Sequence, residues 1–140
     1  MQFSKDIVGI GRYFRRCRNV YMENFGLKGI HARYLMEVSQ TPGVSQDKLA
    51  QRLGVDKSNV ARQAAMLEDN EFLLRKPSTE DKRVLCLYPT EKTLALLPGL
   101  REAMQNWEDA ALGCLERQEK EQLLSLMSKV RIQTEGGGTE

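Results

Sequence analysis

The sequence predicts a mainly α-helical fold with one small β-hairpin, and three patterns in its 140 residues indicate this fold class. Apolar residues recur at steps of three and four near both ends of the chain, which is the spacing of one helix face. In the middle, a glycine separates two short amphipathic segments. Two short runs rich in Val, Leu and Tyr then flank a polar turn, which is typical of a β-hairpin.

Composition argues against several function classes. The formal net charge of +2 is too small to indicate nucleic acid by itself. Three cysteines without a close pair favour a reducing compartment, and a single histidine supplies a Cys/His zinc site poorly. We find no phosphate-binding loop, dinucleotide-binding glycine motif or nucleophile elbow, so we expect no enzyme activity, no cofactor and no metal. The longest apolar run is too short for a membrane span and a signal-peptide core is missing, so we expect a cytoplasmic protein.

The N-terminal part of the chain predicts two helices, over residues 3–24 and 30–40. The first carries an apolar stripe at alternating steps of four and three: Phe3, Ile7, Ile10, Phe14, Cys17 and Tyr21. Such a stripe is typical of helices that pack along their length, so it requires a partner. In the second helix, Tyr34, Leu35 and Val38 are the expected core residues.

Two further helices are predicted around Gly54, which takes the left-handed conformation of a helix stop without steric cost. Ser45 is a good N-cap for the first of them, and Asp56 for the second. Val60, Ala64 and Leu67 fall on one face of the second helix. Two helices joined by a tight turn form a helix-turn-helix, whose second helix can enter a DNA major groove.

The opposite face of that second helix carries hydrogen-bonding or cationic side chains: Lys57, Ser58, Asn59, Arg62 and Gln63. Arg pairs with guanine and Asn or Gln with adenine, so these residue types can read base edges. Ser45 and Gln46, at the start of the preceding helix, could offer backbone N–H groups to a phosphate. Taken alone, this helix could equally present an ordinary solvated face.

A β-hairpin directly behind the second helix favours the DNA-binding interpretation. Strands are predicted over 73–76 and 84–88, on either side of a polar turn over 77–82. Lys76, Lys82 and Arg83 lie near its tip, where cations can reach phosphates or a minor groove.

From residue 67 to residue 90 the chain resembles the winged helix-turn-helix of the MarR family of bacterial transcription regulators. The matching motifs are the D-x-R wing signature Asp81-Lys82-Arg83, the pair Leu67-Glu68, the run 75–78 and the run 90–92. Glu71 stands where the family usually has Gly, so Asn70 or Glu71 must make the turn into the wing. Pro89 also departs from the family pattern, in which an apolar residue is common.

The resemblance implies a winged helix-turn-helix DNA-binding region over 41–90, and a helical dimerisation region over 1–40 and 91–132. Residues 133–140 are expected to be a disordered tail, because the glycine-rich end has nothing to bury. The implied protein is a homodimer that binds a pseudo-palindromic operator in double-stranded DNA. It would be a repressor released by a small phenolic or otherwise lipophilic effector. Asp81 would orient Arg83 on the wing, although an exposed ion pair of little consequence is the alternative.

The resemblance also suggests two regulatory sites, an effector-binding site and a redox-active cysteine. His31 and Tyr34 lie where family members form an effector cavity, and Arg15 or Arg16 could meet an anionic aromatic ligand there. A capping histidine and a core tyrosine are the alternative interpretation. Some peroxide-sensing relatives respond through a reactive cysteine in the first helix, and Cys17 lies on that helix, although closer to the second helix than their sensor cysteine does. A small core residue is the more common role of such a cysteine. An interaction module that binds no DNA is the alternative of another class.

Overall fold

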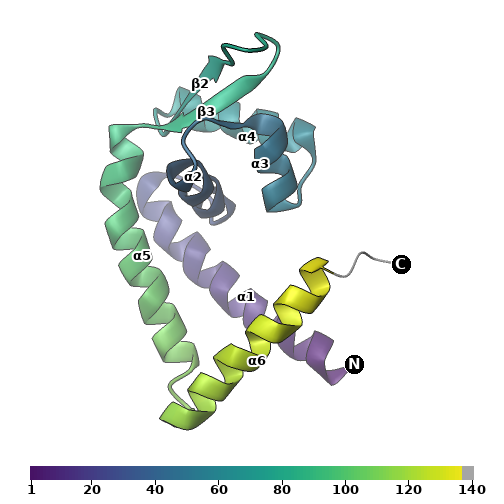
Figure 1. Cartoon of the computed structure of the whole chain (residues 1–140). Coiled ribbons are helices and arrows are strands. Elements are labelled where there is room, and N and C mark those ends of the chain that lie inside the picture. The colour runs from purple at the N-terminus through teal and green to yellow at the C-terminus, as the bar shows by residue number, and fades with distance from the viewer. Residues whose placement is uncertain (137–140) are drawn as a thin grey trace. The chain divides into compact units, whose positions relative to one another are not determined.

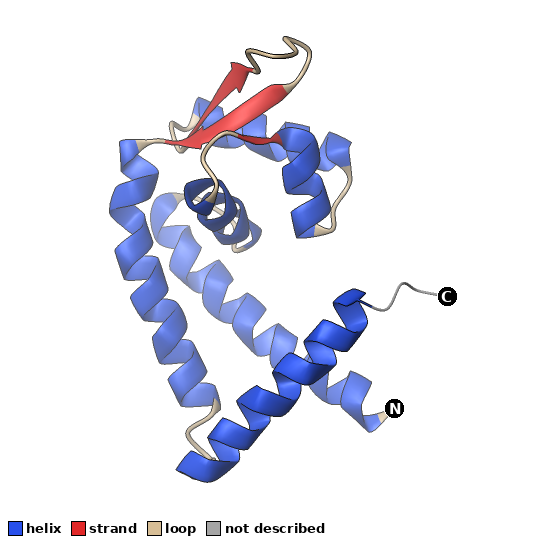
Figure 2. Cartoon of the chain, viewed as in Figure 1, coloured by secondary structure: helices blue, strands red, loops and turns tan. Residues whose placement is uncertain are grey.

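The computed structural model describes residues 1–136 and confirms a mainly helical fold with a small antiparallel sheet (Figures 1 and 2). Two compact units can be distinguished, Met1–Met104 and the part that begins at Gln105. The predicted disordered tail lies partly outside the described residues, at 137–140. Residues 133–136 end the last helix instead.

The first unit begins with α1, Gln2–Met22, which runs into the short 3-10 turn Glu23–Phe25 and then α2, Ile30–Gln40. Tyr34, Leu35 and Val38 have no exposed surface, as predicted for the core side of α2. Asn19 of α1 accepts a hydrogen bond from the backbone N–H of Gly29, at 3.0 Å. A Cβ at Gly29 would collide with that amide oxygen, so glycine allows α1 to cap the start of α2.

The predicted helix-turn-helix consists of α3, Gln46–Leu53, and α4, Lys57–Asp69. Ser45 caps α3, because its hydroxyl oxygen accepts the N–H of Lys48 at 3.1 Å. Gly54 ends α3 with φ of 68°, in the left-handed region that glycine tolerates. Asp56 occupies the N-cap position of α4, but its side chain makes no capping hydrogen bond. Three residues of α4 are fully buried, as predicted: Val60, Ala64 and Leu67.

The sheet contains three strands in the order β1-β3-β2: β1 Val44–Ser45, β2 Leu73–Pro77 and β3 Leu85–Pro89. Both pairings are antiparallel, with Val44 opposite Leu87 and Leu73 opposite Pro89. The hairpin β2–β3 is the predicted wing, and in Figure 1 it extends beyond the helices beneath it. The two-residue β1 was not predicted, because a strand so short has no pattern of its own.

The turn into the wing is made by Glu71, which resolves the alternative left open by the sequence. Its φ is 65°, whereas Asn70 has φ of −95°. The start of α5 holds this unusual backbone in place, because the Thr90 hydroxyl donates to the Glu71 carbonyl at 2.7 Å. Lys92 donates to the Asn70 carbonyl at 3.0 Å, and the Thr93 hydroxyl donates to the Phe72 carbonyl at 2.6 Å.

Helix α5, Glu91–Ala111, runs from the first unit into the second and stays helical through Pro98. In the first unit Leu96, Leu97 and Leu100 bury its inner side. The second unit consists of the end of α5 and helix α6, Arg117–Gly136. No described residue of α6 is buried, and its apolar residues remain 36–61% exposed: Leu123, Leu124, Leu126, Met127, Val130 and Ile132.

Candidate DNA-binding surface

The outward face of α4 presents most of the predicted contact residues to solvent. Lys57, Ser58 and Arg62 are exposed, and Asn59 is half-buried. Lys57 lies 3.4 Å from an Asp47 carboxylate oxygen, but the two side chains are 73% and 66% exposed, so this ion pair is weak. Arg62 has no hydrogen bond or ion pair within residues 1–136. Its guanidinium is therefore available to an external partner, as a reader of guanine requires.

Gln63 is the exception, because its side chain turns inward. Its Oε1 atom lies 2.7 Å from Nε2 of the buried His31, and its Nε2 atom lies 3.4 Å from Oδ1 of Asn59. Burial lowers the pKa of His31 from its ordinary value, an effect that the bond to Gln63 opposes and the charge of Lys28 reinforces. The structure therefore connects Gln63 to α2 and to Asn59.

At the start of α3, Ser45 and Gln46 are both half-buried. The Ser45 hydroxyl is engaged in capping, as described above. Oε1 of Gln46 is buried and has no hydrogen-bond partner among residues 1–136. This end of α3 is therefore less open than the exposed face of α4.

The wing tip carries an ordered arginine. Asp81 accepts three hydrogen bonds from Arg83, from the backbone N–H at 3.0 Å, from Nε at 3.2 Å and from Nη2 at 3.3 Å. The side-chain bond, followed by the backbone bond, lowers the pKa of the Asp81 carboxyl below 3.8. The Arg83 side chain remains 91% exposed. Asp81 thus holds a guanidinium that faces solvent.

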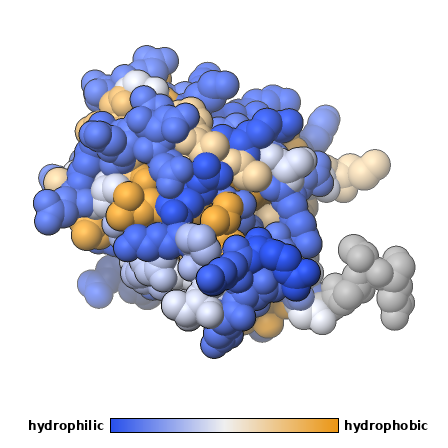
Figure 3. Space-filling view, turned by 90° about the horizontal axis from the view of Figure 1, so that it is seen from above, coloured by the Kyte–Doolittle hydropathy of each residue, from blue (hydrophilic) through white to orange (hydrophobic). Residues whose placement is uncertain are grey.

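The other two wing cations are also exposed. Lys82 lies beside Arg83 in the turn, and Lys76 lies on β2. The Lys76 ammonium is 5.3 Å from the centroid of the Tyr88 ring on β3, which restrains it without neutralising its charge. The face of the molecule seen in Figure 3 is predominantly hydrophilic, with only small apolar patches.

A connection that the sequence did not reveal joins the wing to α4. The Glu68 carboxylate accepts the backbone N–H of Arg75 at 2.9 Å and its Nε–H at 3.1 Å. The two side chains are 32% and 25% exposed, so the pair is partly shielded from water. Glu68 belongs to α4 and Arg75 to β2, so the pair joins the wing to α4. Both residues stood in the family-like motifs, but nothing in their spacing indicated that they meet.

The predicted effector residues differ in how far they are exposed to solvent. His31 is 1% exposed and Tyr34 is fully buried, whereas Arg15 and Arg16 are exposed on α1. Burial raises the pKa of Tyr34, and its hydroxyl has no hydrogen-bond partner within residues 1–136. The His31 Nδ1 atom accepts the Lys28 backbone N–H at 3.0 Å, which is the capping role of the alternative interpretation.

A cavity of about 290 Å³ lies between α1, α2 and α5 in the first unit. It is lined mainly by Arg18, Arg33, Met36, Glu37, Gln40 and Met104. Burial, followed by the charges of Arg33 and Arg15, lowers the pKa of Arg18. Neither Arg18 nor Arg33 has a carboxylate partner within the described part of the chain. The cavity therefore combines two arginines and one glutamate with methionine side chains.

Cys17 is half-buried on α1. The Tyr13 hydroxyl shares a hydrogen bond with it, and burial together with this bond raises the pKa of Tyr13. Cys86 is half-buried on β3 and Cys114 is exposed.

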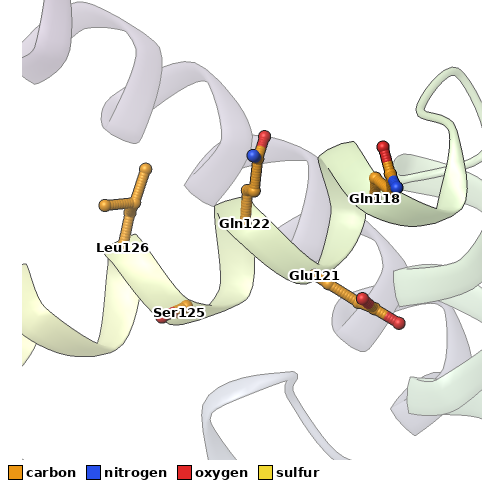
Figure 4. A pocket seen from close by; sticks show the side chains of 5 residues that line it. All are labelled: Gln118, Glu121, Gln122, Ser125 and Leu126. Carbon is orange, nitrogen blue, oxygen red and sulfur yellow. The ribbon is translucent and has the colours of Figure 1, made fainter.

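A hollow along α6 is lined by Gln118, Glu121, Gln122, Ser125 and Leu126. Figure 4 shows that all these side chains come from one helix, so they do not enclose a ligand. Within residues 1–136, no three His, Cys, Asp or Glu side chains gather as metal ligands. In the same residues, no helix combines the length and apolar character needed to cross a membrane.

Comparison with known proteins places these features in a family. Residues 31–85 match the MarR family. Over 127 residues the chain is 30% identical to the HTH-type transcriptional regulator YybA of Bacillus subtilis, covering 91% of this chain and 85% of that protein. The crystal structure of MarR has a TM-score of 0.89 at 21% identity, covering 98% of this chain and 100% of that one. A Listeria monocytogenes MarR family regulator complexed with 26mer DNA has a TM-score of 0.81 at 24% identity, covering 97% and 95% of the two chains.

Proposed function

The chain belongs to the MarR family of DNA-binding transcriptional regulators, which is not a family of enzymes, and from this premise we propose that it is a homodimeric repressor of a pseudo-palindromic operator. Residues 41–90 form its DNA-binding region. Residues 1–40 and 91–132 form its dimerisation region. A small lipophilic or phenolic effector releases the repressor from DNA.

Two exposed arginines carry the DNA-contact proposal: an unpaired Arg62 on α4, and on the wing an Arg83 that Asp81 holds in place. In this proposal α4 enters a major groove, where Arg62 and Asn59 meet base edges. Lys57, Ser58, Lys76, Lys82 and Arg83 contact the DNA backbone or the adjacent minor groove. The complex of the Listeria relative with 26mer DNA supports this use of the fold.

The dimer proposal is supported by apolar surface that the single chain leaves uncovered. Phe3, Ile7 and Ile10 of α1 are 54%, 39% and 53% exposed, and the apolar residues of α6 are similarly open. Burial of such side chains is favourable by about 25 cal/mol per Å², so a second copy that covers them would be stable. Two-fold pairing would also present two α4 helices to successive major grooves of one operator.

The effector proposal uses the cavity between α1, α2 and α5. Arg18 and Arg33 favour an anionic or phenolic group, and Met36 and Met104 offer an adaptable apolar lining. A ligand there would release DNA by binding more tightly to a dimer whose two α4 helices do not match successive grooves. Arg15 and Arg16 stay proposed as outer contacts, whereas His31 and Tyr34 would contribute only if the core rearranged.

The oxidant-sensing alternative rests on Cys17. Its half-buried thiol and its hydrogen bond with Tyr13 are the observations that favour it. Mass spectrometry of peroxide-treated protein, together with operator binding, tests it. Modification of Cys17 with loss of binding supports this alternative, and binding that survives complete modification of Cys17 contradicts it.

The DNA-binding proposal is tested by selecting bound sequences from a random duplex pool. The selected operator should be a pseudo-palindrome with half-sites about 10 base pairs apart, and it should bind a protein dimer. Arg62→Ala should lose preference at one position of each half-site, whereas Arg101→Ala, an exposed arginine of α5, should not. A failure to enrich any sequence would contradict the proposal.

The effector proposal is tested with benzoate and phenol as probes. Each is titrated into the protein–operator complex while release is followed by fluorescence anisotropy. Arg33→Met should require a higher probe concentration for release than the wild type, whereas Arg101→Met should match the wild type. Equal release curves for all variants, or no release at all, would contradict this site.

A further inference from the structure

A continuous chain of hydrogen bonds leads from the start of α2 to the reading face of α4. The Lys28 backbone N–H donates to Nδ1 of His31 at 3.0 Å. Nε2 of His31 meets Oε1 of Gln63 at 2.7 Å, and Nε2 of Gln63 donates to Oδ1 of Asn59 at 3.4 Å. These hydrogen bonds therefore connect residues 32 positions apart in the sequence, and they end on Asn59, a proposed base contact.

The direction of this chain is fixed at its buried end. A backbone N–H can only donate, so Nδ1 of His31 must accept and carries no hydrogen. The hydrogen of the neutral ring is then on Nε2, which must donate to the carbonyl oxygen of Gln63. Gln63 must therefore turn its NH₂ group toward Asn59, and Asn59 must turn its carbonyl oxygen toward Gln63.

We propose that His31 and Gln63 are positioning residues that orient the Asn59 amide, so that Asn59 offers its NH₂ group to the DNA. This inference rests on the proposed reading of DNA by α4. His31 is 1% exposed and is therefore shielded from competing water. Gln63 acts through Asn59 in this arrangement, and it is not itself a base contact.

The orientation has a consequence for base preference. The usual pairing of Asn with adenine uses both its oxygen and its NH₂ group, because adenine offers N7 as acceptor and N6 as donor. With the oxygen turned toward Gln63, Asn59 presents donors only. Guanine alone offers two acceptors side by side in the major groove, N7 and O6. Asn59 should therefore prefer guanine over adenine.

The test compares sequences that wild type and variants select from a random duplex pool. Asn59→Ala identifies the base position that Asn59 reads, as the one whose preference disappears. In the wild type, guanine should dominate at that position. Gln63→Met removes both hydrogen bonds and should reduce the preference for guanine by about tenfold, within the range expected for one base contact.

Gln63→Glu gives a sharper outcome. A carboxylate accepts from His31 with one oxygen and from the Asn59 NH₂ group with the other, which turns the Asn59 oxygen outward. The preferred base should then change from guanine to one with an exposed amino group, adenine or cytosine. Gln51→Glu, an exposed glutamine of α3, is the matched control for the added negative charge and should retain guanine.

A second measurement is independent of variant folding. His31 is the single histidine, so one imidazole ¹⁵N spectrum of the wild-type protein reports its tautomer directly. A hydrogen on Nε2 at neutral pH supports the chain of bonds, and a hydrogen on Nδ1 overturns it. Unchanged base preference in folded Gln63→Met and Gln63→Glu also overturns the inference. If the wild type selects no sequence at all, the proposed function fails instead.

Discussion

Replacing Glu68 by Ala is expected to weaken operator binding, although Glu68 is not among the proposed DNA contacts. The substitution removes the acceptor of both hydrogen bonds from Arg75 and so frees the wing from α4. Hydrogen bonds to a charged group contribute about 1.5–3 kcal/mol each when well shielded. The Glu68 and Arg75 side chains are 32% and 25% exposed, so solvent screening reduces the combined contribution of the two hydrogen bonds to about 2 kcal/mol.

This magnitude predicts two measurable changes. The midpoint of thermal unfolding should fall by about 6 °C, since 1 kcal/mol shifts a domain of this size by about 3 °C. Operator affinity should fall by about tenfold, which is the effect of losing one wing contact. Calorimetry at fixed protein concentration measures the first change, because the stability of a dimer depends on concentration. Fluorescence anisotropy with the selected operator measures the second.

Glu80→Ala is the matched control, because Glu80 is an exposed glutamate of the wing turn whose side chain makes no ion pair among residues 1–136. Both its unfolding midpoint and its operator affinity should stay close to those of the wild type. A role of the Glu68–Arg75 pair in positioning the wing would be refuted if Glu68→Ala matched Glu80→Ala in operator affinity. It would also be refuted if Glu68→Ala lost stability without losing affinity.

Three further predictions concern the binding surface and the buried histidine. Arg62→Ala should cost about 1–3 kcal/mol of specific operator binding, measured by anisotropy, with a much smaller loss on unrelated duplexes. Asp81→Ala should weaken operator binding while leaving the unfolding midpoint unchanged, because its pair with Arg83 is exposed. The folded state lowers the pKa of His31 below 6.5, so the unfolded chain binds the proton more tightly. The free energy of unfolding, measured with urea, should therefore fall as the pH drops through about 6.5.

Distinct results would contradict these predictions. Equal losses on operator and unrelated DNA would make Arg62 a phosphate contact rather than a base reader. Full operator affinity of a folded Asp81→Ala protein would reduce its pair with Arg83 to an ordinary surface ion pair. For His31, a wild-type stability that follows the same pH profile as His31→Gln would exclude the proposed linkage, since the chain has no other histidine.

Local patterns in the sequence predicted the helix-turn-helix well, because its signals lie within a few residues of each other. Ser45 caps α3, Gly54 ends it, and the buried stripe of α4 follows the helical period. The family resemblance located the wing and left two candidates, Asn70 and Glu71, for the residue that makes the turn into it. The structure shows that Glu71 makes this turn, since its φ is positive. A hydrogen bond from Thr90, at the start of α5, to the Glu71 carbonyl holds this backbone in place.

Local patterns could not predict contacts between different helices and strands. Strand β1 exists only because Val44 and Ser45 pair with β3, more than 40 residues away. The bonds between Glu68 and Arg75 and between His31 and Gln63 likewise depend on how α4 meets β2 and α2. Gln63 was predicted as a DNA contact from its spacing on α4, and spacing alone does not show that its side chain also bonds to His31.

The most direct test of the account is the salt dependence of operator binding by the wild type and by Lys82→Ala. The logarithm of affinity should fall steeply with the logarithm of salt concentration, because counterions are released from contacted phosphates. The wing of each subunit contributes Lys82, so the variant should reduce this slope by about two in a dimer, about one per lost contact. An unchanged slope, or no measurable binding to any duplex, would contradict the claim that α4 and the wing form the DNA-binding surface.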